Sequence, residues 1–343
     1  MNPLQIYLSY QSAEASKRSE MAGFSLRNSL IPHQQFKRAV STMAELHHYS
    51  LQNEVGGGIV ITGPSGVGKT TILKHYLGLN PRVEEREKSR IPVLHVVTPS
   101  SPTVRSMTDA ILIALGASSA GKRSAEEKTL RIYKLLKLCE IELLLIDEFQ
   151  HFYYANTIVE FRKISDWLKN LISHTGLAVV LTGLPEAELV VRSNEQLERR
   201  FSTKLALTPF SLESPDDFQE FRGILKQFQE KLPLRPEIDL YENNLARRFL
   251  VASNGLLDYV RKILEGAVSI ALSAGHQSLD LQTYAAGFRK EVWSDVPDRL
   301  NPFHPNSPLR KLNHSGEPFY AEDKRQAIGS PLARRIANLP ASR

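Results

Sequence analysis

A glycine-rich stretch around residue 65 is the part of the sequence best suited to chemistry. Its residues fit the pattern G-x-x-x-x-G-K-[ST]; they are Gly63, Pro64, Ser65, Gly66, Val67, Gly68, Lys69 and Thr70, followed by Thr71. Glycines allow the backbone N–H groups of such a loop to turn inward around phosphates. Lys69 then reaches the β- and γ-phosphates, and the hydroxyl of Thr70 becomes a ligand of Mg²⁺. The pattern therefore predicts a nucleotide-binding loop.

A pair of carboxylates further along the chain is the second candidate. Asp147 and Glu148 follow the apolar run 143–146. A strand ending there delivers both carboxylates to its carboxyl end, where ligands bind in open α/β sheets. Asp147 is expected to hold Mg²⁺, and Glu148 to orient or activate the attacking water. Together with the loop, these residues predict ATP hydrolysis, with ATP and Mg²⁺ as the cofactors.

A polar side chain ends another apolar run. Thr182 closes the segment 177–183. If that strand neighbours the one that carries Asp147, the Thr182 hydroxyl can bond to the water or to the γ-phosphate. The alternative is a threonine that simply ends a strand.

Two adjacent arginines form the last candidate of this kind. Arg199 and Arg200 precede Phe201. Either guanidinium can enter the site of a neighbouring subunit as an arginine finger, which stabilises charge in the transition state. The alternative is a solvated basic pair, or an ion pair with Glu195 or Glu198.

The elements that position these residues alternate along the first two thirds of the chain. Apolar strands are expected at 56–63, 92–99, 141–148 and 177–183, and helices at 34–52, 70–79, 103–116, from Ser124 onward and at 158–173. Ser124 and Glu127 form a capping box at the start of their helix. Such alternation predicts an α/β fold with a parallel sheet covered by helices on both faces.

The chain after residue 210 has a different pattern. Ser214 and Pro215 mark a helix start, with the proline at the first helical position. Helices are expected at 215–231, 240–253 and 256–273. We therefore divide the chain into an N-terminal extension (1–30), an α/β ATPase core (31–210), a small all-helical lid (211–296) and a flexible, basic, proline-rich tail (297–343).

The tail has few periodic apolar residues and much of the net charge. Eight of its residues are basic and four acidic, so it carries +4 of the chain's +6. We predict a mobile arm with embedded motifs such as 331–340 (PLARRIANLP). It is either a docking peptide that orders on a partner or an inert solvated segment.

Composition excludes several classes of protein. The chain has 343 residues, of which 42% are hydrophobic and 23% charged, as in ordinary globular proteins. No apolar run is long enough for a membrane span, so no membrane partner is expected. The single cysteine, Cys139, excludes a disulfide framework. We expect a cytoplasmic protein without a secretory signal.

The combined motifs resemble those of AAA+ ATPases. They are GPSGVGKTT, LLLIDEFQHF, VVLTG, QLERRF and GLLDYVRKIL. The segments LIPHQQFKRAV, TPSSPTVRSMTDAILIALGA and TGLPEAELVVRSNEQLERRF resemble the TniB/TnsC family of transposition ATPases more closely. The resemblance covers about residues 25–290.

The resemblance implies a function and partners. Such proteins assemble as ATP-dependent rings or filaments on double-stranded DNA and do not cut it. They couple a TniQ-type target-selection protein to transposase subunits of the TnsA/TnsB kind, and here the tail is a candidate docking arm. Carried over, Lys69, Thr70, Asp147, Glu148 and Thr182 match the nucleotide site. Arg200 matches the finger best, and Arg199 second.

The resemblance also points to DNA contacts and to a lid sensor. The stretches that match pore loops contain Arg105, Lys122 and Arg123, which can contact phosphates; the alternative is a solvated loop. The usual lid arginine is replaced here by Asp258. Arg261, or Lys262 beside it, is the candidate substitute as a nucleotide sensor.

Two other functions remain open at this stage. An AAA+ ATPase of another process, such as secretion or replication loading, shares the nucleotide motifs. A scaffold whose nucleotide site only maintains its shape is the other possibility, and the intact Glu148 argues against it.

Overall fold

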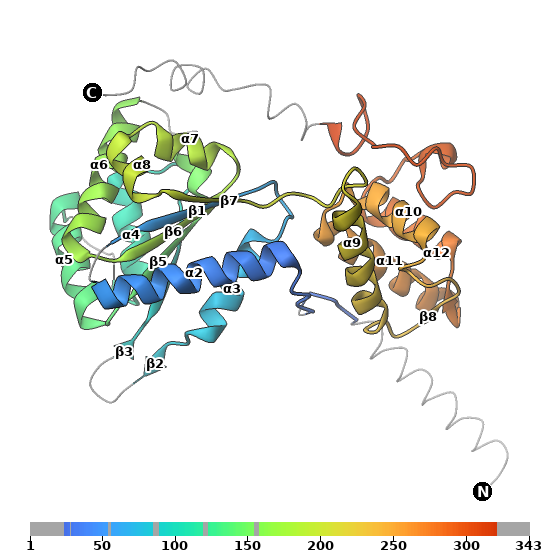
Figure 1. Ribbon diagram of the computed structural model, residues 1–343, viewed down its shortest axis with the longest axis horizontal. Helices are drawn as coiled ribbons and strands as arrows, with labels where there is room; N and C mark the ends of the chain where they lie inside the picture. Colours follow the sequence, from blue (N-terminus) through green and yellow to red (C-terminus); the bar gives the residue numbers. More distant parts are fainter. Residues whose placement is uncertain are drawn as a thin grey trace, which may run out of the picture. The chain divides into compact units, whose positions relative to one another are not determined.

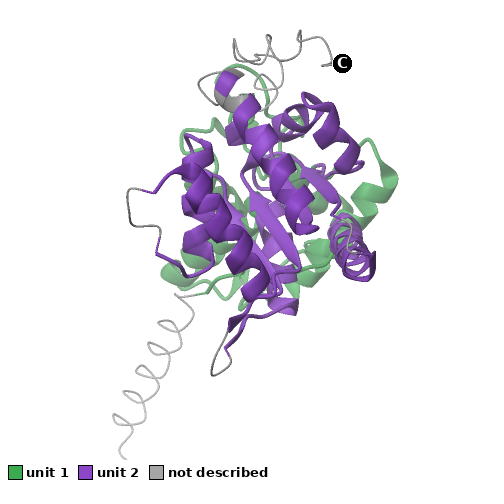
Figure 2. Ribbon diagram, turned by 90° about the vertical axis from the view of Figure 1, so that its left-hand side faces the viewer, with its two compact units in different colours: residues 1–33, 209–325 green, residues 34–208, 326–343 purple. Residues whose placement is uncertain are grey.

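The computed structural model describes residues 24–320, apart from 28, 54–55, 85–88, 119–122 and 154–157. It divides into two compact units, drawn in different colours in Figure 2. Among the described residues, 34–208 form what we call the α/β unit. Residues 24–33 and 209–320 form what we call the helical unit. Along the chain, the boundaries between the units fall at 33–34 and 208–209, whereas the sequence predicted limits of 31 and 210 for the ATPase core.

The α/β unit is built on one five-stranded sheet (Figure 1). Its strands are β1 (Gly58–Thr62), β4 (Val93–Val97), β5 (Leu143–Asp147), β6 (Ala178–Gly183) and β7 (Thr203–Ala206). Their order is β4-β5-β6-β1-β7, and every pairing is parallel. All residues of β1, β5 and β6 are buried, as expected where a parallel sheet is covered on both faces.

Helices cover the two faces of this sheet. They are α2 (Gln34–Asn53), α3 (Lys69–Leu79), α4 (Val104–Ala114), α5 (Ala125–Leu138), α6 (Ile158–Thr175), α7 (Glu186–Arg192) and α8 (Glu195–Arg200). Along β5, Leu144 and Ile146 join the core cluster that contains side chains of α4 to α6, whereas Leu143 and Leu145 are buried outside it. Since strand side chains alternate, the second pair faces the side where α2 and α3 lie. The predicted α/β class and its two helical layers are confirmed.

Short elements complete this unit. A two-stranded antiparallel ribbon pairs β2 (Val83–Glu84) with β3 (Ser89–Arg90), and a 3₁₀ turn, η1, spans Phe149–Phe152. Ser124 accepts a hydrogen bond from the Glu127 backbone at 3.2 Å and donates its own N–H to the Glu127 side chain at 2.8 Å. The capping box is thus present at the start of α5.

The helical unit contains four main helices. They are α9 (Pro215–Gln229), α10 (Asn243–Ser253), α11 (Leu257–Ala274) and α12 (Leu281–Glu291), with a short parallel pair of β8 (Arg235–Pro236) and β9 (Ser278–Leu279) and a 3₁₀ turn, η2 (Asp298–Leu300). Ser214 caps α9, as predicted. Gly255 separates α10 from α11 at φ +71°, and a Cβ there would lie 2.0 Å from the Phe210 carbonyl oxygen. Only glycine fits that turn.

The first part of the predicted tail belongs to the helical unit. Phe303, Leu312 and Phe319 are at most 2% exposed and lie in its core. The ring of Phe303 packs edge-on against the ring of Phe249, with 4.9 Å between the ring centroids. The prediction of a flexible segment beginning at residue 297 was therefore wrong, because widely spaced apolar residues bury themselves without helical periodicity. Residues 321–343, including the motif at 331–340, lie outside the described residues.

The described part of the N-terminal region also packs onto the helical unit. Leu26 and Ile31 are buried in the same core. The carboxylate of Glu265 accepts hydrogen bonds from the Leu26 backbone at 2.6 Å and from the Ser25 hydroxyl at 2.9 Å. Because this segment belongs to the helical unit, the α/β unit starts at residue 34 and not at the predicted residue 31. None of the helices in the described parts of the chain is long and apolar enough to span a bilayer.

Candidate nucleotide-binding site

The glycine-rich loop joins the end of β1 to the first residue of α3, as its pattern requires. Gly66 and Gly68 have φ angles of +80° and +107°, which favour glycine. A Cβ built on Gly68 meets nothing within 4 Å, so it is the φ angle, and not the available space, that favours glycine there. A Cβ on Gly63 would instead lie 2.6 Å from the Leu207 carbonyl oxygen. The loop is therefore close-packed at its base, where it leaves β1.

Lys69 lies inside this loop. Its Nζ donates to the carbonyl oxygens of Gly63 at 2.7 Å and of Pro64 at 2.9 Å. Burial lowers the pKa of the ammonium group, and the negative charges of Glu148 and Asp147 partly oppose this shift. A phosphate placed before the helix N-terminus would supply the anionic partner that favours the charged form.

Asp147 joins the two predicted strand ends to the loop. Its Oδ2 accepts a hydrogen bond from Thr70 Oγ1 at 3.0 Å, and its Oδ1 accepts one from Thr182 Oγ1 at 2.5 Å. Strands β5 and β6 are neighbours, which is the arrangement that the Thr182 prediction required. A hydroxyl and a carboxylate in contact are hard oxygen ligands, so Thr70 and Asp147 fit Mg²⁺.

Glu148 begins the turn that follows β5. Its backbone is left-handed, with φ +57°, and its N–H donates to Asp147 Oδ1 at 2.9 Å. One carboxylate oxygen accepts a hydrogen bond from Gln150 Nε2 at 2.5 Å. The structure thus brings together Lys69, Thr70, Asp147, Thr182 and Glu148, which are five of the residues that the sequence predicted for nucleotide chemistry.

Sequence reasoning missed polar residues beside this cluster. Gln150 stands in the motif that carries Glu148, but its type alone gave it no role. Thr98 follows β4, donates its N–H to the Asp147 carbonyl at 2.9 Å and is 2% exposed. Within the described residues its hydroxyl has no hydrogen-bond partner. Its position after an apolar strand was the same signal that identified Thr182.

The arginine pair ends α8. Phe201 is fully buried, and its ring occupies the space that a Cβ on Gly58 of β1 would need. Arg200 donates to the Ser173 hydroxyl at 2.9 Å. Arg199 is the more exposed of the two, with 76% of its side chain accessible and an ion pair to Glu195. The pair is therefore anchored to the sheet at one end and presented at the surface of the unit.

The remaining candidates belong to other segments of the chain. Arg105, in the first turn of α4, and Arg123, before α5, are both exposed, whereas Lys122 lies outside the described residues. Arg261 is in α11 of the helical unit, where it pairs with Asp258 at 2.6 Å and with Glu265 at 2.8 Å. Asp258, which stands in the usual position of the lid arginine, thus pairs with Arg261, the candidate substitute for that arginine.

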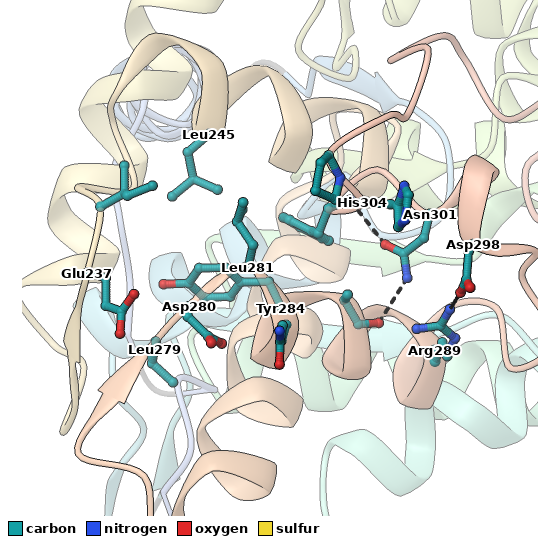
Figure 3. Close-up of a pocket in the computed structure, with 15 residues that line it drawn as sticks. Glu237, Leu245, Leu279, Asp280, Leu281, Tyr284, Arg289, Asp298, Asn301 and His304 are labelled. Atoms are coloured by element: carbon teal, nitrogen blue, oxygen red, sulfur yellow. Dashed lines mark hydrogen bonds and ion pairs between the residues drawn. The ribbon is translucent and has the colours of Figure 1, made fainter.

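The helical unit has a pocket of its own, of about 580 Å³ (Figure 3). Two of its polar side chains are paired: Arg289 binds Asp298, and Asn301 donates to the Ala285 carbonyl oxygen at 3.1 Å. Within the described residues, the buried Tyr284 hydroxyl has no hydrogen-bond partner. None of the predicted site residues lines it. The pocket therefore adds nothing to the nucleotide site.

Comparison with solved structures shows which proteins share this fold. The fold is similar to the ORC2 protein of Aeropyrum pernix in ADPNP–ADP complexes (TM-score 0.58, 16% identity, 79% of this chain and 72% of that one). It is also similar to Cdc6p of Pyrobaculum aerophilum (0.56, 13%, 82% and 73%) and to A. pernix ORC1 in complex with DNA (0.54, 18%, 76% and 66%). These similarities, at 13–18% identity, show that the chain shares the fold of these ORC and Cdc6 proteins.

The particular family follows from the sequence. The model of the bacterial TniB protein matches residues 24–211, more than half of the chain. The chain therefore belongs to the TniB family. No curated protein sequence matches it.

Proposed function

We propose that this protein hydrolyses ATP with Mg²⁺ and uses that cycle to regulate DNA transposition. The contact network of Thr70, Asp147 and Thr182 beside the buried Lys69 is the observation that supports hydrolysis most strongly. These residues come from the loop and two neighbouring strands, so their meeting depends on the whole sheet.

Each residue has a distinct part in the proposed reaction. Bound Mg·ATP supplies the electrophilic phosphoryl group and a divalent charge that offsets its phosphates. Backbone N–H groups of 65–68 and the Lys69 ammonium would bind the phosphates, while Thr70 and Asp147 would hold the metal. The Glu148 carboxylate takes a proton from the attacking water. Arg200, or Arg199 beside it, reaches the site of a neighbouring copy and stabilises charge there.

The ATPase proposal has a direct test. Wild type should release phosphate from ATP only with Mg²⁺, and Glu148→Gln should lower kcat by about 10²-fold or more while keeping ATP bound, since general-base catalysis contributes that much. Arg200→Ala and Arg199→Ala should lower kcat only where copies assemble. Arg192→Ala, which removes an exposed α7 arginine paired with Glu188, serves as the control. ATP turnover by Glu148→Gln at the wild-type rate would contradict the mechanism.

Membership of the TniB family supports the role in transposition. We propose that copies of the chain assemble on double-stranded DNA as a ring or filament without cutting it. The proposed partners are a TniQ-type target selector and transposase subunits of the TnsA/TnsB kind. The proposed contacts to DNA phosphates are the exposed Arg105 and Arg123, together with Lys122. Arg261 is the proposed nucleotide sensor of the lid.

Electron microscopy of the protein with duplex DNA tests this role. ATP-dependent rings or filaments, stabilised by Glu148→Gln, are the expected result. Arg105→Ala together with Arg123→Ala should weaken DNA binding and reduce its salt dependence. A protein that stays monomeric and does not bind DNA would contradict the proposed role on DNA but not the proposed ATPase activity. Removing residues 321–343 then tests whether this segment recruits the transposase, because residues 297–320 are part of the helical core.

A further inference from the structure

Gln150 is a buried amide that bonds to the proposed catalytic carboxylate. It lies in the turn η1 and is 4% exposed. Its Nε2 donates to Glu148 Oε2 at 2.5 Å, and its Oε1 accepts from the Leu184 backbone N–H at 3.0 Å. Both ends of one side-chain amide are therefore engaged, by two different segments of the chain.

The second contact fixes which end of the amide faces Glu148. An amide has one acceptor end and one donor end. Since the Leu184 N–H requires the oxygen, the nitrogen must face the carboxylate. Only Oε2 of Glu148 takes this bond, so Oε1 keeps its lone pairs directed elsewhere. One oxygen is thus held in place while the other remains able to accept a proton from water.

The chain leaves room for this amide at a glycine. A Cβ on Gly183 would lie 2.5 Å from Gln150 Oε1 and 3.1 Å from Gln150 N. Gly183 directly follows Thr182, the residue that bonds to Asp147. At the end of β6, Gly183 therefore leaves space for the Gln150 side chain, and Thr182 bonds to Asp147.

We propose that Gln150 is a positioning residue that holds the Glu148 carboxylate for hydrolysis and couples it to the β6–α7 turn. This inference rests on the ATPase activity proposed above. Glu148 needs such support because its left-handed backbone is sparsely populated by non-glycine residues. Leu184 opens the segment that continues through α7 to the arginines of α8. If assembly moves that segment, the Gln150 side chain transmits the movement to the Glu148 carboxylate.

Two substitutions of Gln150 separate its two contacts. Gln150→Glu keeps an acceptor for the Leu184 N–H but removes the donor to Glu148, whereas Gln150→Ala removes both. Gln229→Glu is a matched control, because Gln229 likewise bridges the Asp239 carboxylate at 2.7 Å and the Leu240 N–H at 2.7 Å, in the helical unit. Gly183→Ala is a further variant, which displaces the amide without replacing it.

Steady-state kinetics and binding of a fluorescent ADP analogue provide the readouts. Both Gln150 variants should lower kcat about 10- to 100-fold while KM and the affinity for the analogue stay within twofold of wild type. Gly183→Ala should likewise lower kcat without changing KM or the affinity for the analogue, and Gln229→Glu should leave all three unchanged. In a Glu148→Gln background, Gln150→Ala should cause no further loss of kcat, since a residue that acts through another is not additive with it.

Other outcomes contradict the inference. A kcat within threefold of wild type for Gln150→Ala would exclude positioning. Parallel losses of kcat and of analogue affinity would indicate a purely structural role, as would a full additional loss in the Glu148→Gln background. A wild-type protein that binds ATP without hydrolysing it would contradict the proposed function itself. An active wild type with an unaffected Gln150→Ala would contradict only this inference.

Discussion

Thr182 donates a hydrogen bond to Asp147 Oδ1 at 2.5 Å, across the carboxyl ends of two neighbouring strands. The pairing of Ile146 with Leu181, one residue before each, sets this contact. The other carboxylate oxygen accepts from Thr70 at 3.0 Å. Both oxygens of Asp147 therefore have a donor, and the orientation of the carboxylate is defined by the sheet and the loop together.

Removing the Thr182 hydroxyl should disturb Asp147. Thr182→Val removes one of the two donors to Oδ1 of a carboxylate that is 2% exposed, while the Glu148 N–H remains; losing a hydrogen bond to a charged group costs about 1.5–3 kcal/mol. We expect a lower Tm for the nucleotide-free protein and a Mg²⁺ requirement for hydrolysis raised about tenfold, whereas Thr182→Ser should match wild type. Thermal unfolding and magnesium titration check this. Equal behaviour of the valine and serine variants would show that the contact is dispensable.

Lys69→Ala should separate binding from stability. The ammonium is buried against two carbonyl oxygens, and burial lowers its pKa, so its removal should not lower the Tm of the nucleotide-free protein. The affinity for ATP should fall about 10²-fold or more, because a charged contact to phosphate is lost. Thermal shift with and without ATP measures both effects. Lys74→Ala, an exposed position on α3, is the control. A retained ATP-induced shift in Lys69→Ala would contradict the assignment.

Local patterns allowed much of the fold and the nucleotide loop to be predicted. The spacing of glycines with Lys69 and Thr70 is contained in one short stretch, and the apolar runs of β1, β5 and β6 are continuous because both faces of these strands are buried. Helix starts at Ser124 and Ser214 were also local, since capping involves residues three positions apart.

The parts that were missed depend on distant contacts. Gln150 gains its role from Leu184, which is 34 residues away, and no spacing rule connects them. Strand β7 has only one buried residue, Leu205, so it carries no alternating pattern. Phe303 and Phe319 were assigned to a tail because their neighbours are polar and proline-rich. Their burial depends on packing against side chains of helices that are distant in the sequence.

Truncation should confirm the boundary of the helical core. A chain that ends at residue 320 should keep the Tm of the full-length protein, whereas one that ends at 296 should lose much of it. Phe303→Ala alone should cost about 3–5 kcal/mol, the usual cost of emptying a buried phenylalanine site. Leu212→Ala, at a position 38% exposed, is the matched control. Urea unfolding measures each change. Similar midpoints for the two truncations would contradict the packing of 297–320.

The alkaline stability of the α/β unit should depend on Tyr76. Its hydroxyl bonds to His47 Nδ1 at 3.0 Å, and His47 Nε2 bonds to Glu142 at 3.0 Å. Burial, with a smaller effect of the negative Glu142, raises the pKa of Tyr76 to about 12. Because this folded-state pKa exceeds the unfolded value of about 10, the folded chain binds more protons between the two values.

The stability that Tyr76 contributes is thus fully present below pH 10 and is lost as the pH rises towards 12. Tyr76→Phe should be less stable than wild type at pH 8, since His47 loses a partner, but its urea midpoint should fall less steeply between pH 9 and 11. For one proton the limiting difference in slope is about 1.4 kcal/mol per pH unit. Tyr49→Phe, at a position 57% exposed, controls for ordinary tyrosine ionisation. Parallel profiles for wild type and Tyr76→Phe would show that the Tyr76 hydroxyl ionises as freely in the folded chain as in the unfolded one.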